Sequence, residues 1–491
     1  MKASGPDSPP ECKQQPEVIE LVPKPELDRA QQQIERQQRE IERLKQEIQR
    51  LRKELEAAWR AAKRQAAPFS RGEPKAQPKP PGRKPGDRYG KHRRRAVPER
   101  VDETYRAPLP ERCDCGGRIG RQETKPQYQE EIVRRKIVRR FEVEIGRCDH
   151  CGKRWQGRHP WQTSDALDAA QVQLGPEALA LAAQLNKQLG LSLGHTAAVL
   201  RAGYDLSVSR GGLCRALGRL GRKAEPTYQA LTLALRRSLV IWMDETGWKV
   251  AARLEWLWVA VSQQVTVYKI LPGRGWEQAV ELVSPAYAGC LEHDGWAVYG
   301  RFVDALHQSC LNHLLKRCRE IIAIGSPAAV RFPRAVKGLL EQSLKLRDRY
   351  QEGEISEHGL WTAAGRIQAQ LGRLLDRNWR TQANRRLAKH LRHQEPQLFT
   401  FLHCPGVEAT NNRAERALRP AVIARKVWGG NRTANGARTQ QILASVLVSC
   451  QQQGKDALDR IVSLLRAPQA TILDLAPSRP PPWPQAGIGT P

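Results

Sequence analysis

Three acidic residues occupy positions from which a strand or a helix could present them to divalent metal ions. Asp244 lies in the apolar run SLVIWMDETGWKV, Asp294 follows a second strand-like segment, GCLEHDGWAVY, and Glu415 lies in the helical segment TNNRAERALRPAVIARK. Carboxylate oxygens are hard ligands that suit Mg²⁺ and Mn²⁺. Two such ions, about 3.5–4 Å apart, can activate an attacking oxygen and stabilise a leaving alkoxide in phosphodiester chemistry. The pattern therefore predicts a two-metal site, with Asp244 bridging the ions and Asp294 and Glu415 each completing one.

The elements that must position these acids follow a recognisable order. Three strand-like segments from residue 238 onward are followed by a helix, WEQAVELVS, and by a fourth strand. This is the order of an RNase H-like α/β core, in which the central first strand and the fourth strand each carry one acid. We assign this core to residues 236–313 and 406–450. Since side chains alternate along a strand, Glu245 should point away from Asp244 and be a turn or supporting residue rather than a ligand.

The third acid has a plainer interpretation as well. Arg413, Arg416 and Arg419 lie close to Glu415 in the sequence. A single acid among arginines is more often part of a surface ion pair than a metal ligand. Thr410 or Asn411 can cap the helix, and Pro420 predicts a kink or a later start. The other two acids, each at the expected point of one fold, favour the metal-ligand interpretation.

A glycine-rich segment and two histidines near the acids are further candidates for contact with phosphate or metal. The Gly-rich turn Trp428–Arg432 is expected near Glu415 and near a phosphate. His307 and His313 are less favoured as metal ligands, because a satisfied or exposed histidine is the commoner outcome. His307 could assist the scissile phosphate.

Two close cysteine pairs indicate a second, structural metal site. Cys113 and Cys115 form one pair and Cys148 and Cys151 the other, and a Gly follows each pair. Between them, Tyr128–Ile145 alternates charged and branched residues, which predicts paired strands. Four thiolates around such a hairpin describe a zinc ribbon, assigned to residues 105–160, with His150 as a substitute ligand. A closed Zn²⁺ site of this kind would stabilise the fold and take no part in catalysis.

The charge balance favours a polyanionic partner. The 491 residues hold 81 Lys and Arg against 51 Asp and Glu, a formal net charge of +30. Such a field concentrates nucleic acid. A membrane surface is the competing partner, but the sequence has no amphipathic anchor, signal peptide or apolar stretch long enough to span a bilayer. The odd count of 11 cysteines suggests a reduced cytoplasm rather than a disulfide framework.

The N-terminal third is predicted to be extended. Residues 1–25 read as a disordered leader, and residues 26–66 carry a heptad pattern. One seam position of that pattern holds Leu27, Ile34, Ile41, Ile48 and Leu55, and the other holds Ala30, Gln37, Leu44, Leu51 and Ala58. The pattern predicts a parallel coiled coil, and hence a homodimer or higher oligomer, with a single solvated helix as the alternative. Residues 67–104 form a Pro-rich basic linker, in which Arg71–Arg100 contains 11 basic and 3 acidic residues. A mobile basic arm of this kind binds phosphates without sequence preference.

Three helical segments complete the organisation. Residues 170–225 resemble a helix-turn-helix with Ser207 or Ser209 as the cap of a basic helix, which either reads DNA or packs on the next domain. Residues 314–405 are basic amphipathic helices inserted between the second and third acids, which could cover the site and hold DNA or serve only as a packing module. Residues 451–491 are assigned to a C-terminal helix and a disordered, Pro-rich tail. The chain is thus expected to be a multidomain α+β protein.

Several of these segments resemble a known family. MDET, HDGWAVYGRF, and NNRAERALRP followed by VWGGNRTANGAR are similar to motifs of transposases in the insertion-sequence sixty-six family, and the resemblance extends over most of the chain. It departs at the tight Cys113/Cys115 pair and at HQSCLNHLLKRC, where the family more often has a Cys-Trp-Ala-His-type stretch.

The resemblance implies an acidic triad at Asp244, Asp294 and Glu415, and two Mg²⁺ or Mn²⁺ ions in addition to structural Zn²⁺. It implies DNA as the partner, both the element's terminal repeats and a target, with accessory proteins of the same element as further candidates. The expected location is the cytoplasm, at the nucleoid. An RNase H-like nuclease or resolvase, or a DNA-binding regulator without activity, are the alternatives.

Overall fold

The computed structural model describes residues 24–63, 97–119, 123–130, 132, 136–162 and 172–477. It divides into two compact units, Met1–Arg94 and Arg95–Pro491, each described here by itself. The predicted leader and most of the predicted basic linker lie outside the described residues, as does the Pro-rich tail beyond residue 477.

The first unit contains one long helix, α1 (Lys24–Lys63), of 40 residues. At 1.5 Å per residue it is about 60 Å long. Its sequence is rich in Glu, Gln, Arg, Lys and Leu, which are good helix formers. The described apolar residues of the predicted seam are each about half exposed, namely Ile34, Ile41, Leu44, Ile48 and Leu51. The helix is therefore as predicted, and its pairing with a second helix stays a prediction.

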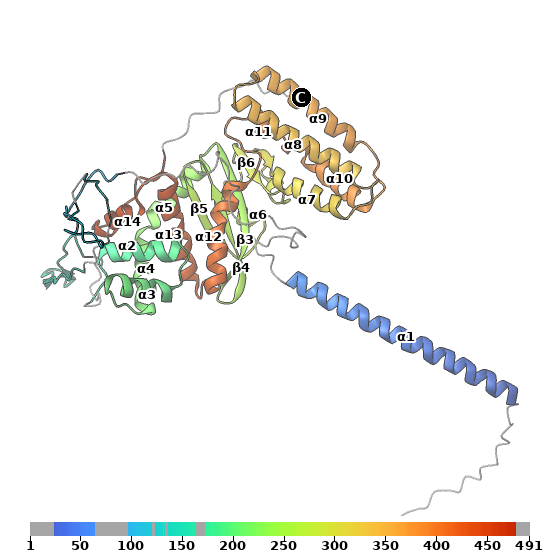
Figure 1. The fold of residues 1–491 in the computed structure, drawn as a ribbon, viewed down its shortest axis with the longest axis horizontal. Helices are drawn as coiled ribbons and strands as arrows, with labels where there is room; N and C mark the ends of the chain where they lie inside the picture. Colours follow the sequence, from blue (N-terminus) through green and yellow to red (C-terminus); the bar gives the residue numbers. More distant parts are fainter. Residues whose placement is uncertain are drawn as a thin grey trace, which may run out of the picture. The chain divides into compact units, whose positions relative to one another are not determined.

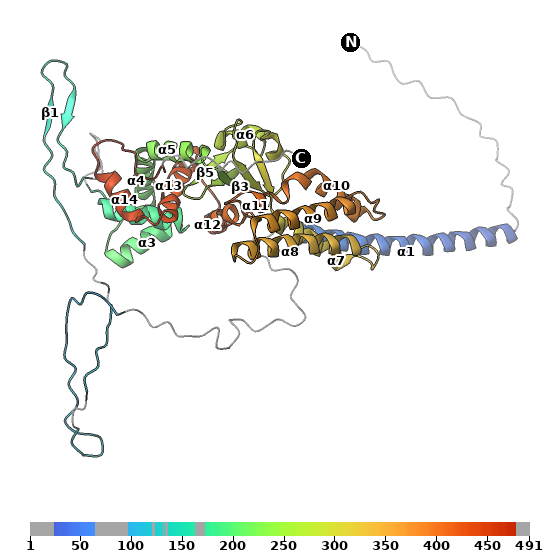
Figure 2. The same ribbon diagram turned by 90° about the horizontal axis from the view of Figure 1, so that it is seen from above.

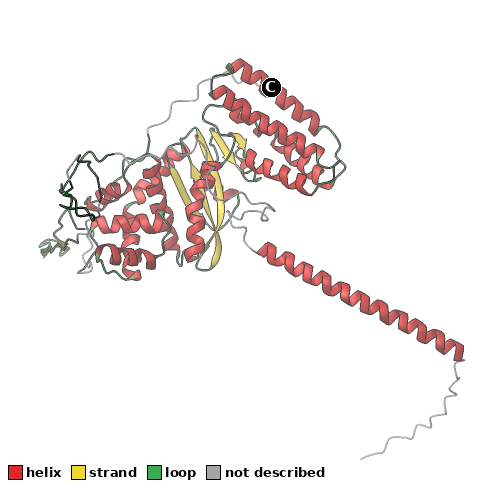
Figure 3. Ribbon diagram, in the orientation of Figure 1, coloured by secondary structure: helices red, strands yellow, loops and turns green. Residues whose placement is uncertain are grey.

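The second unit is organised around a five-stranded mixed sheet with the order β5-β4-β3-β6-β7 (Figures 1 and 3). The strands are β3 (Val240–Val250), β4 (Arg253–Val261), β5 (Thr266–Leu271), β6 (Cys290–His293) and β7 (Leu306–Ser309). The first three are antiparallel neighbours, and β6 and β7 run parallel to β3. Helix α6 (Trp276–Leu282) lies between β5 and β6 in the chain. The mixed α/β architecture is compatible with the predicted fold class.

The central strand β3 separates two hydrophobic cores. Val240, Trp242 and Trp248 belong to one core, whereas Ile241 and Met243 belong to the other. This alternation follows from the two-residue period of a strand that is buried on both faces. Figure 1 shows the corresponding helices on the two sides of the sheet, green and red helices on one side and yellow to orange helices on the other.

The first core holds the helical region that precedes the sheet together with the last two helices. These elements are α2 (Pro176–Ala183) with a π-helical turn at Gln184–Gln188, α3 (Leu193–Tyr204), α4 (Arg210–Lys223), α5 (Glu225–Arg236), α13 (Ala434–Gln452) and α14 (Ala457–Arg466). Ser209 caps α4 as predicted, because its Oγ accepts the Gly212 N–H at 3.0 Å. The apolar face of α4 is buried in this shared core, so the helix-turn-helix-like region packs on the sheet unit and exposes only its basic face.

The second core holds the helices between β7 and the segment of Glu415. They are α7 (Leu311–Ile324), α8 (Arg331–Gln351), α9 (Glu357–Leu375), α10 (Gln382–Gln394), α11 (Thr400–His403) and α12 (Asn412–Trp428). The predicted helical insertion is thus helical throughout most of its length. Within the described residues, no helix is both long and apolar enough to cross a bilayer.

The cysteine-rich region has less regular structure than predicted. A short hairpin of β1 (Ile145–Arg147) and β2 (Arg154–Gln156) is visible in Figure 2. The expectation of paired strands over Tyr128–Ile145 is wrong, because among the described residues of that range only Ile145 belongs to a strand. Its apolar residues Ile132, Ile137 and Val138 are 78%, 54% and 84% exposed, so the alternation has no buried face to stabilise a ladder.

Candidate active site

The register of β3 and β6 brings Asp244 and Asp294 opposite each other. Val240 pairs with Cys290 and Trp242 with Glu292, and both acids lie two residues beyond the last of these pairs. Adjacent strands are about 4.8 Å apart, and residues two positions apart share one face. Asp244 therefore lies within the central strand next to the end of β6, and Asp294 lies in the bend directly after β6.

Asn411 fixes the start of the Glu415 helix against the same strand. It is 1% exposed, and its Nδ2 donates to the Met243 carbonyl oxygen at 2.7 Å. It occupies the N-cap position of α12, as predicted, but its side chain makes this contact rather than a cap hydrogen bond. Glu415 lies in the first turn of α12, and its backbone N–H donates to the Asn411 carbonyl at 3.2 Å. Because Met243 precedes Asp244, this contact aligns the third acid with the first.

The arginines around Glu415 do not reduce it to a plain surface ion pair. Arg413 is directed elsewhere, since its Nε donates to Glu408 at 2.7 Å and its guanidinium lies over the Trp242 ring. Pro420 lies inside α12, and the helix continues through it to Trp428. The helix thus starts where the predicted cap lies, and not after the proline.

The acids share an unfavourable electrostatic environment. Burial raises the pKa of Asp244 well above its usual range, and the charges of Glu245, Asp294 and Glu415 raise the pKa further. The Glu245 N–H, which donates to Asp244 Oδ1 at 2.9 Å, only partly offsets this effect. Like charges that converge on a buried carboxylate are stabilised by a cation. Among the described residues the three carboxylates do not all lie within 4.8 Å of one another, but their oxygens are the ligands that divalent ions such as Mg²⁺ prefer.

Glu245 lies on the opposite face of β3, as predicted from alternation, and supports the site through Arg274. Its side chain is 1% exposed and accepts from Arg274 Nε and from the Tyr299 hydroxyl, both at 2.5 Å. Arg274 also reaches Asp294, with Nη2 3.9 Å from Oδ2, and its guanidinium lies 4.3 Å from the centre of the Trp296 ring. This arginine links the buried acid to one of the three candidate ligands. Sequence reasoning did not find it, because Arg274 lies in a loop with no motif.

The glycine of the DGW motif is required by its backbone and by the inserted helices. Gly295 has a φ of +87°, and a Cβ there would lie 2.0 Å from Gln394 of α10. Gln394 Nε2 donates to the Gly295 carbonyl at 3.2 Å. The charge of Asp294 also raises the pKa of His390 on α10, whose net shift is downward because of burial. The insertion therefore reaches the edge of the acid cluster.

His307 is a structural residue rather than a candidate for phosphate contact. The Gly295 N–H donates to His293 Nδ1 at 3.0 Å, so His293 Nε2 carries the proton that it shares with His307 Nδ1 at 3.0 Å. His307 Nε2 then donates to the Phe302 carbonyl at 3.0 Å. Burial lowers the pKa of His307, and it lowers the pKa of His293 to about 3. Both ring nitrogens of His307 are engaged, and the predicted assistance to the phosphate is wrong.

Glu415 also belongs to a group with Cys310, which the sequence reasoning missed, and with His313, which it had disfavoured as a metal ligand. Among the described residues, Cys310, His313 and Glu415 are the group of metal-ligating side chains whose ligand atoms all lie within 4.8 Å of one another. His313 Nε2 is 4.0 Å from Glu415 Oε1. The Cys-x-x-His spacing at the start of α7 is the signal that could have revealed it, since it places both residues on one helix turn.

The predicted zinc ligands form two separate knuckles. The Cys113 N–H donates to Gly117 O at 2.8 Å, and the Cys148 N–H to Lys153 O at 2.9 Å. Backbone N–H groups lower the pKa of Cys115, chiefly from Gly117, and that of Cys148, chiefly from Cys151. Among the described residues, none of these four sulfurs belongs to a group of three or more ligand atoms within 4.8 Å of one another, so the ribbon stays a prediction.

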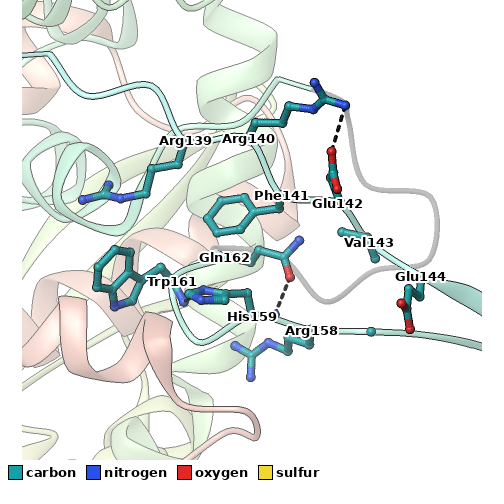
Figure 4. A pocket seen from close by; sticks show the side chains of 11 residues that line it. Arg139, Arg140, Phe141, Glu142, Val143, Glu144, Arg158, His159, Trp161 and Gln162 are labelled. Atoms are coloured by element: carbon teal, nitrogen blue, oxygen red, sulfur yellow. Dashed lines mark hydrogen bonds and ion pairs between the residues drawn. The ribbon is translucent and has the colours of Figure 1, made fainter.

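A hollow near this region is separate from the acids. It is lined by two extended segments, 139–144 and 157–162, and Figure 4 shows their side chains around it. The Arg139 guanidinium lies 4.7 Å from the centre of the Trp161 ring, and none of the three candidate metal ligands lines the hollow. Its chemistry is that of a basic and aromatic surface.

The Gly-rich turn after α12 lies at the far end of that helix from Glu415. Thirteen residues of helix separate the acid from Trp428, about 20 Å at 1.5 Å per residue. The turn packs on β3 instead, because Asn431 N donates to Lys249 O at 2.8 Å and Gly430, with φ +114°, approaches the same carbonyl. The expectation of a turn near Glu415 is therefore wrong.

Comparison with known proteins gives two matches. A family model described as "Transposase IS66 family" matches residues 171–439. A curated protein of Sinorhizobium fredii, printed as "Uncharacterized protein y4qI", is 24% identical over 294 residues, covering 53% of this chain and 53% of that protein. The chain thus spans about half the length of the curated relative that it matches.

Proposed function

The chain belongs to the IS66 family of transposases, and from this premise we propose that it cuts and joins DNA strands at the ends of an insertion sequence, using Asp244, Asp294 and Glu415 as metal ligands. The family match confirms the resemblance predicted from the motifs. The finer proposal rests on one observation above all. Asp244 and Asp294 have matching positions in the β3–β6 register, and the Asn411 contact with the Met243 carbonyl holds the start of the Glu415 helix against the same strand.

Each acid has a distinct task in the proposed chemistry. Two Mg²⁺ or Mn²⁺ ions bound here would activate the attacking oxygen and stabilise the departing one. Asp244, on the rigid central strand, would bridge the two positions. Asp294 would complete one and Glu415 the other. Asp294 Oδ1 accepts the Trp296 N–H at 2.9 Å and Oδ2 lies 3.9 Å from Arg274 Nη2, so both contacts orient this carboxylate. Asn411 keeps the Glu415 helix against β3. Water is the first attacking group and the freed 3′-OH the second, so no side-chain nucleophile is needed.

We further propose that the sheet unit is an RNase H-like core. The support is the topology, with three antiparallel strands, a crossover helix and two strands parallel to the first. In sheets of this kind, acids at the ends of neighbouring parallel strands meet at one edge. Asp294 directly follows β6, and Asp244 lies within β3, two residues beyond its last pair with β6.

DNA contact by this chain is proposed for its basic surfaces. The outer face of α4 exposes Arg210, Arg215, Arg219 and Arg222, spaced three to five residues apart along the helix. Positive side chains on one helix face neutralise phosphates, and stacked basic and aromatic groups such as Arg139 on Trp161 suit nucleic acid as well. Zinc at the two cysteine knuckles and pairing through α1 belong to the same proposal.

A strand-joining assay tests the function. The full chain is incubated with Mn²⁺ and labelled DNA from the segments that flank its coding region. We expect joined product from the wild type and none from Asp244→Asn, Asp294→Asn or Glu415→Gln, all with DNA binding retained. Glu320→Gln, an exposed acid on α7, is the matched control and should join DNA normally.

Two other outcomes would replace the proposal. Cleavage without joining identifies a nuclease or resolvase. Tight binding with neither reaction identifies a regulator. If the acid variants lose DNA binding together with activity, the metal-ligand assignment fails, because a metal ligand is not required to hold the DNA.

A further inference from the structure

We propose that Cys310, His313 and Glu415 form a binding site for a thiophilic divalent cation such as Zn²⁺ at the border of the acid cluster. An ion here would be held by sulfur, nitrogen and oxygen, whereas Asp244 and Asp294 offer oxygen alone. The link to catalysis rests on the proposed function, since Glu415 is common to both. The binding of the ion rests on the geometry of the three side chains.

The distances are close to those of an occupied site. The three ligand atoms lie within 4.8 Å of one another, with 4.0 Å between His313 Nε2 and Glu415 Oε1. Tetrahedral Zn²⁺, with bonds of about 2.0–2.3 Å, requires ligand atoms roughly 3.3–3.7 Å apart. The His313 and Glu415 side chains are 47% and 33% exposed and free to close this difference by rotation, whereas Cys310 is 2% exposed and fixed.

Two helix starts that face each other hold the sulfur in place. Cys310 is the N-cap residue of α7, and the Leu311 N–H donates to the Ala409 carbonyl at 2.9 Å just before α12 begins. The Cys310 Sγ accepts the Asn411 N–H at 3.3 Å and receives the N–H groups of Asn312 and His313. Burial raises the pKa of the Cys310 thiol to about 11 and these N–H groups only partly offset that effect, so a bound cation would have to stabilise the thiolate that ligates it.

The wall of this site contains an oxygen without a partner. Asn411 Oδ1 is buried and accepts no hydrogen bond in the part of the chain that the structure describes, although the Asn411 N–H and Nδ2 are both engaged. Buried acceptors are rarely left unpaired, and one that is unpaired commonly faces a water or an ion. This acceptor belongs to the residue whose backbone N–H contacts the Cys310 sulfur.

The donor set selects the class of ion. A combination of thiolate, imidazole and carboxylate suits Zn²⁺ and Co²⁺, whereas Mg²⁺ takes oxygen ligands almost alone. Three protein ligands leave a fourth position open, which is the arrangement of catalytic rather than structural zinc sites. The partly exposed Glu415 borders this open position.

Cobalt binding to the full chain tests the site. Co²⁺ bound to a thiolate has a sulfur-to-metal charge-transfer band, and the predicted ribbon cysteines contribute the same background in every variant. We expect Cys310→Ser to bind one equivalent of Co²⁺ less than the wild type and to lose the corresponding part of the band. Cys318→Ser, a second buried cysteine of α7, is the matched control and should keep both. Unchanged stoichiometry and band in Cys310→Ser would overturn the proposal.

A second variant avoids any effect on folding. His313 is on the surface, and His313→Ala should weaken the Cys310-dependent Co²⁺ binding at least tenfold with an unchanged thermal melt. Full affinity in His313→Ala would equally overturn the site. The outcome is separable from the proposed function. If the Cys310-dependent band is present and the chain never joins DNA, the cation site is supported and the proposed function fails. If the chain joins DNA through Asp244 and the band is absent, the proposed function is supported and the cation site fails.

Discussion

Glu292 is a buried acid. Its replacement by glutamine should stabilise the protein relative to the wild type, and this difference should grow as the pH rises. It lies on β6 two residues before Asp294, is 1% exposed, and its Oε1 accepts the Glu408 N–H at 2.5 Å. Burial raises the pKa of Glu292 from 4.5 to about 9. The folded protein therefore holds this carboxyl in its neutral form at pH 7, whereas the unfolded chain has it ionised.

The size of the effect follows from proton linkage. Each pH unit between the unfolded and the folded pKa costs about 1.4 kcal/mol, so folding at pH 7 costs roughly 3 kcal/mol for proton uptake by Glu292. Because the folded pKa is the higher one, the stabilising contribution is complete below about pH 4.5 and is lost as the pH rises through about 9. In Glu292→Gln the amide is neutral in both states and keeps an oxygen for the Glu408 N–H, so this pH dependence should disappear.

Urea unfolding followed by tryptophan fluorescence measures the difference. Between about pH 5.5 and 8.5, the stability of Glu292→Gln relative to the wild type should rise by roughly 4 kcal/mol. Glu320→Gln, on the surface of α7, should show no such trend. A difference that stays constant with pH would mean that Glu292 is ionised in the folded protein, and the burial argument would be refuted.

Three further changes follow from the same contacts. Asn411→Ala removes the hydrogen bond to Met243 O, so we expect the free energy of unfolding in urea to fall by about 1–3 kcal/mol. Strand joining should fall further, because the Glu415 helix is no longer held against β3. Normal strand joining would contradict this. Arg274→Gln leaves the buried Glu245 without its ion-pair partner and should lower the free energy of unfolding by about 2–3 kcal/mol. This is less than for a fully buried pair, because Arg274 is 32% exposed. Arg274→Lys should recover part of the lost stability, and equal stability of the wild type and both variants would contradict the prediction. Deletion of residues 26–64 should lower the number of subunits in the assembly, measured as its molar mass in light scattering. The reason is that the half-exposed apolar seam residues of α1 are predicted to pair with a second helix. An unchanged number of subunits would mean that α1 is a single solvated helix.

Local patterns in the sequence predicted the elements that hold the candidate site. The apolar runs around Asp244 and Asp294 predicted neighbouring strands, and the polar residues before α12 predicted its start at Asn411. These signals are local, because strand period and helix caps depend on residues only a few positions apart.

Contacts that depend on register and packing could not be predicted. The sequence does not show that Arg274 would meet Glu245, or that Cys310 would face Glu415, because each pair is joined only by the way whole elements pack. Two of the three errors have a similar origin. Tyr128–Ile145 has the alternation of a strand but no partner face, and the Gly-rich turn is near Glu415 in sequence but a full helix away in space.

Backbone cleavage by bound iron would report the convergence of the three acids without a DNA substrate. Fe²⁺ occupies oxygen-rich sites of Mg²⁺ type, and with ascorbate and peroxide it cuts the polypeptide next to where it is bound. Mass spectrometry of the fragments should locate cuts near Asp244, near Asp294 and near Glu415 in one sample, all suppressed by excess Mg²⁺ and absent from Asp244→Asn. Cuts at only one of these positions, or cuts that Mg²⁺ does not suppress, would mean that the three carboxylates do not share a metal site.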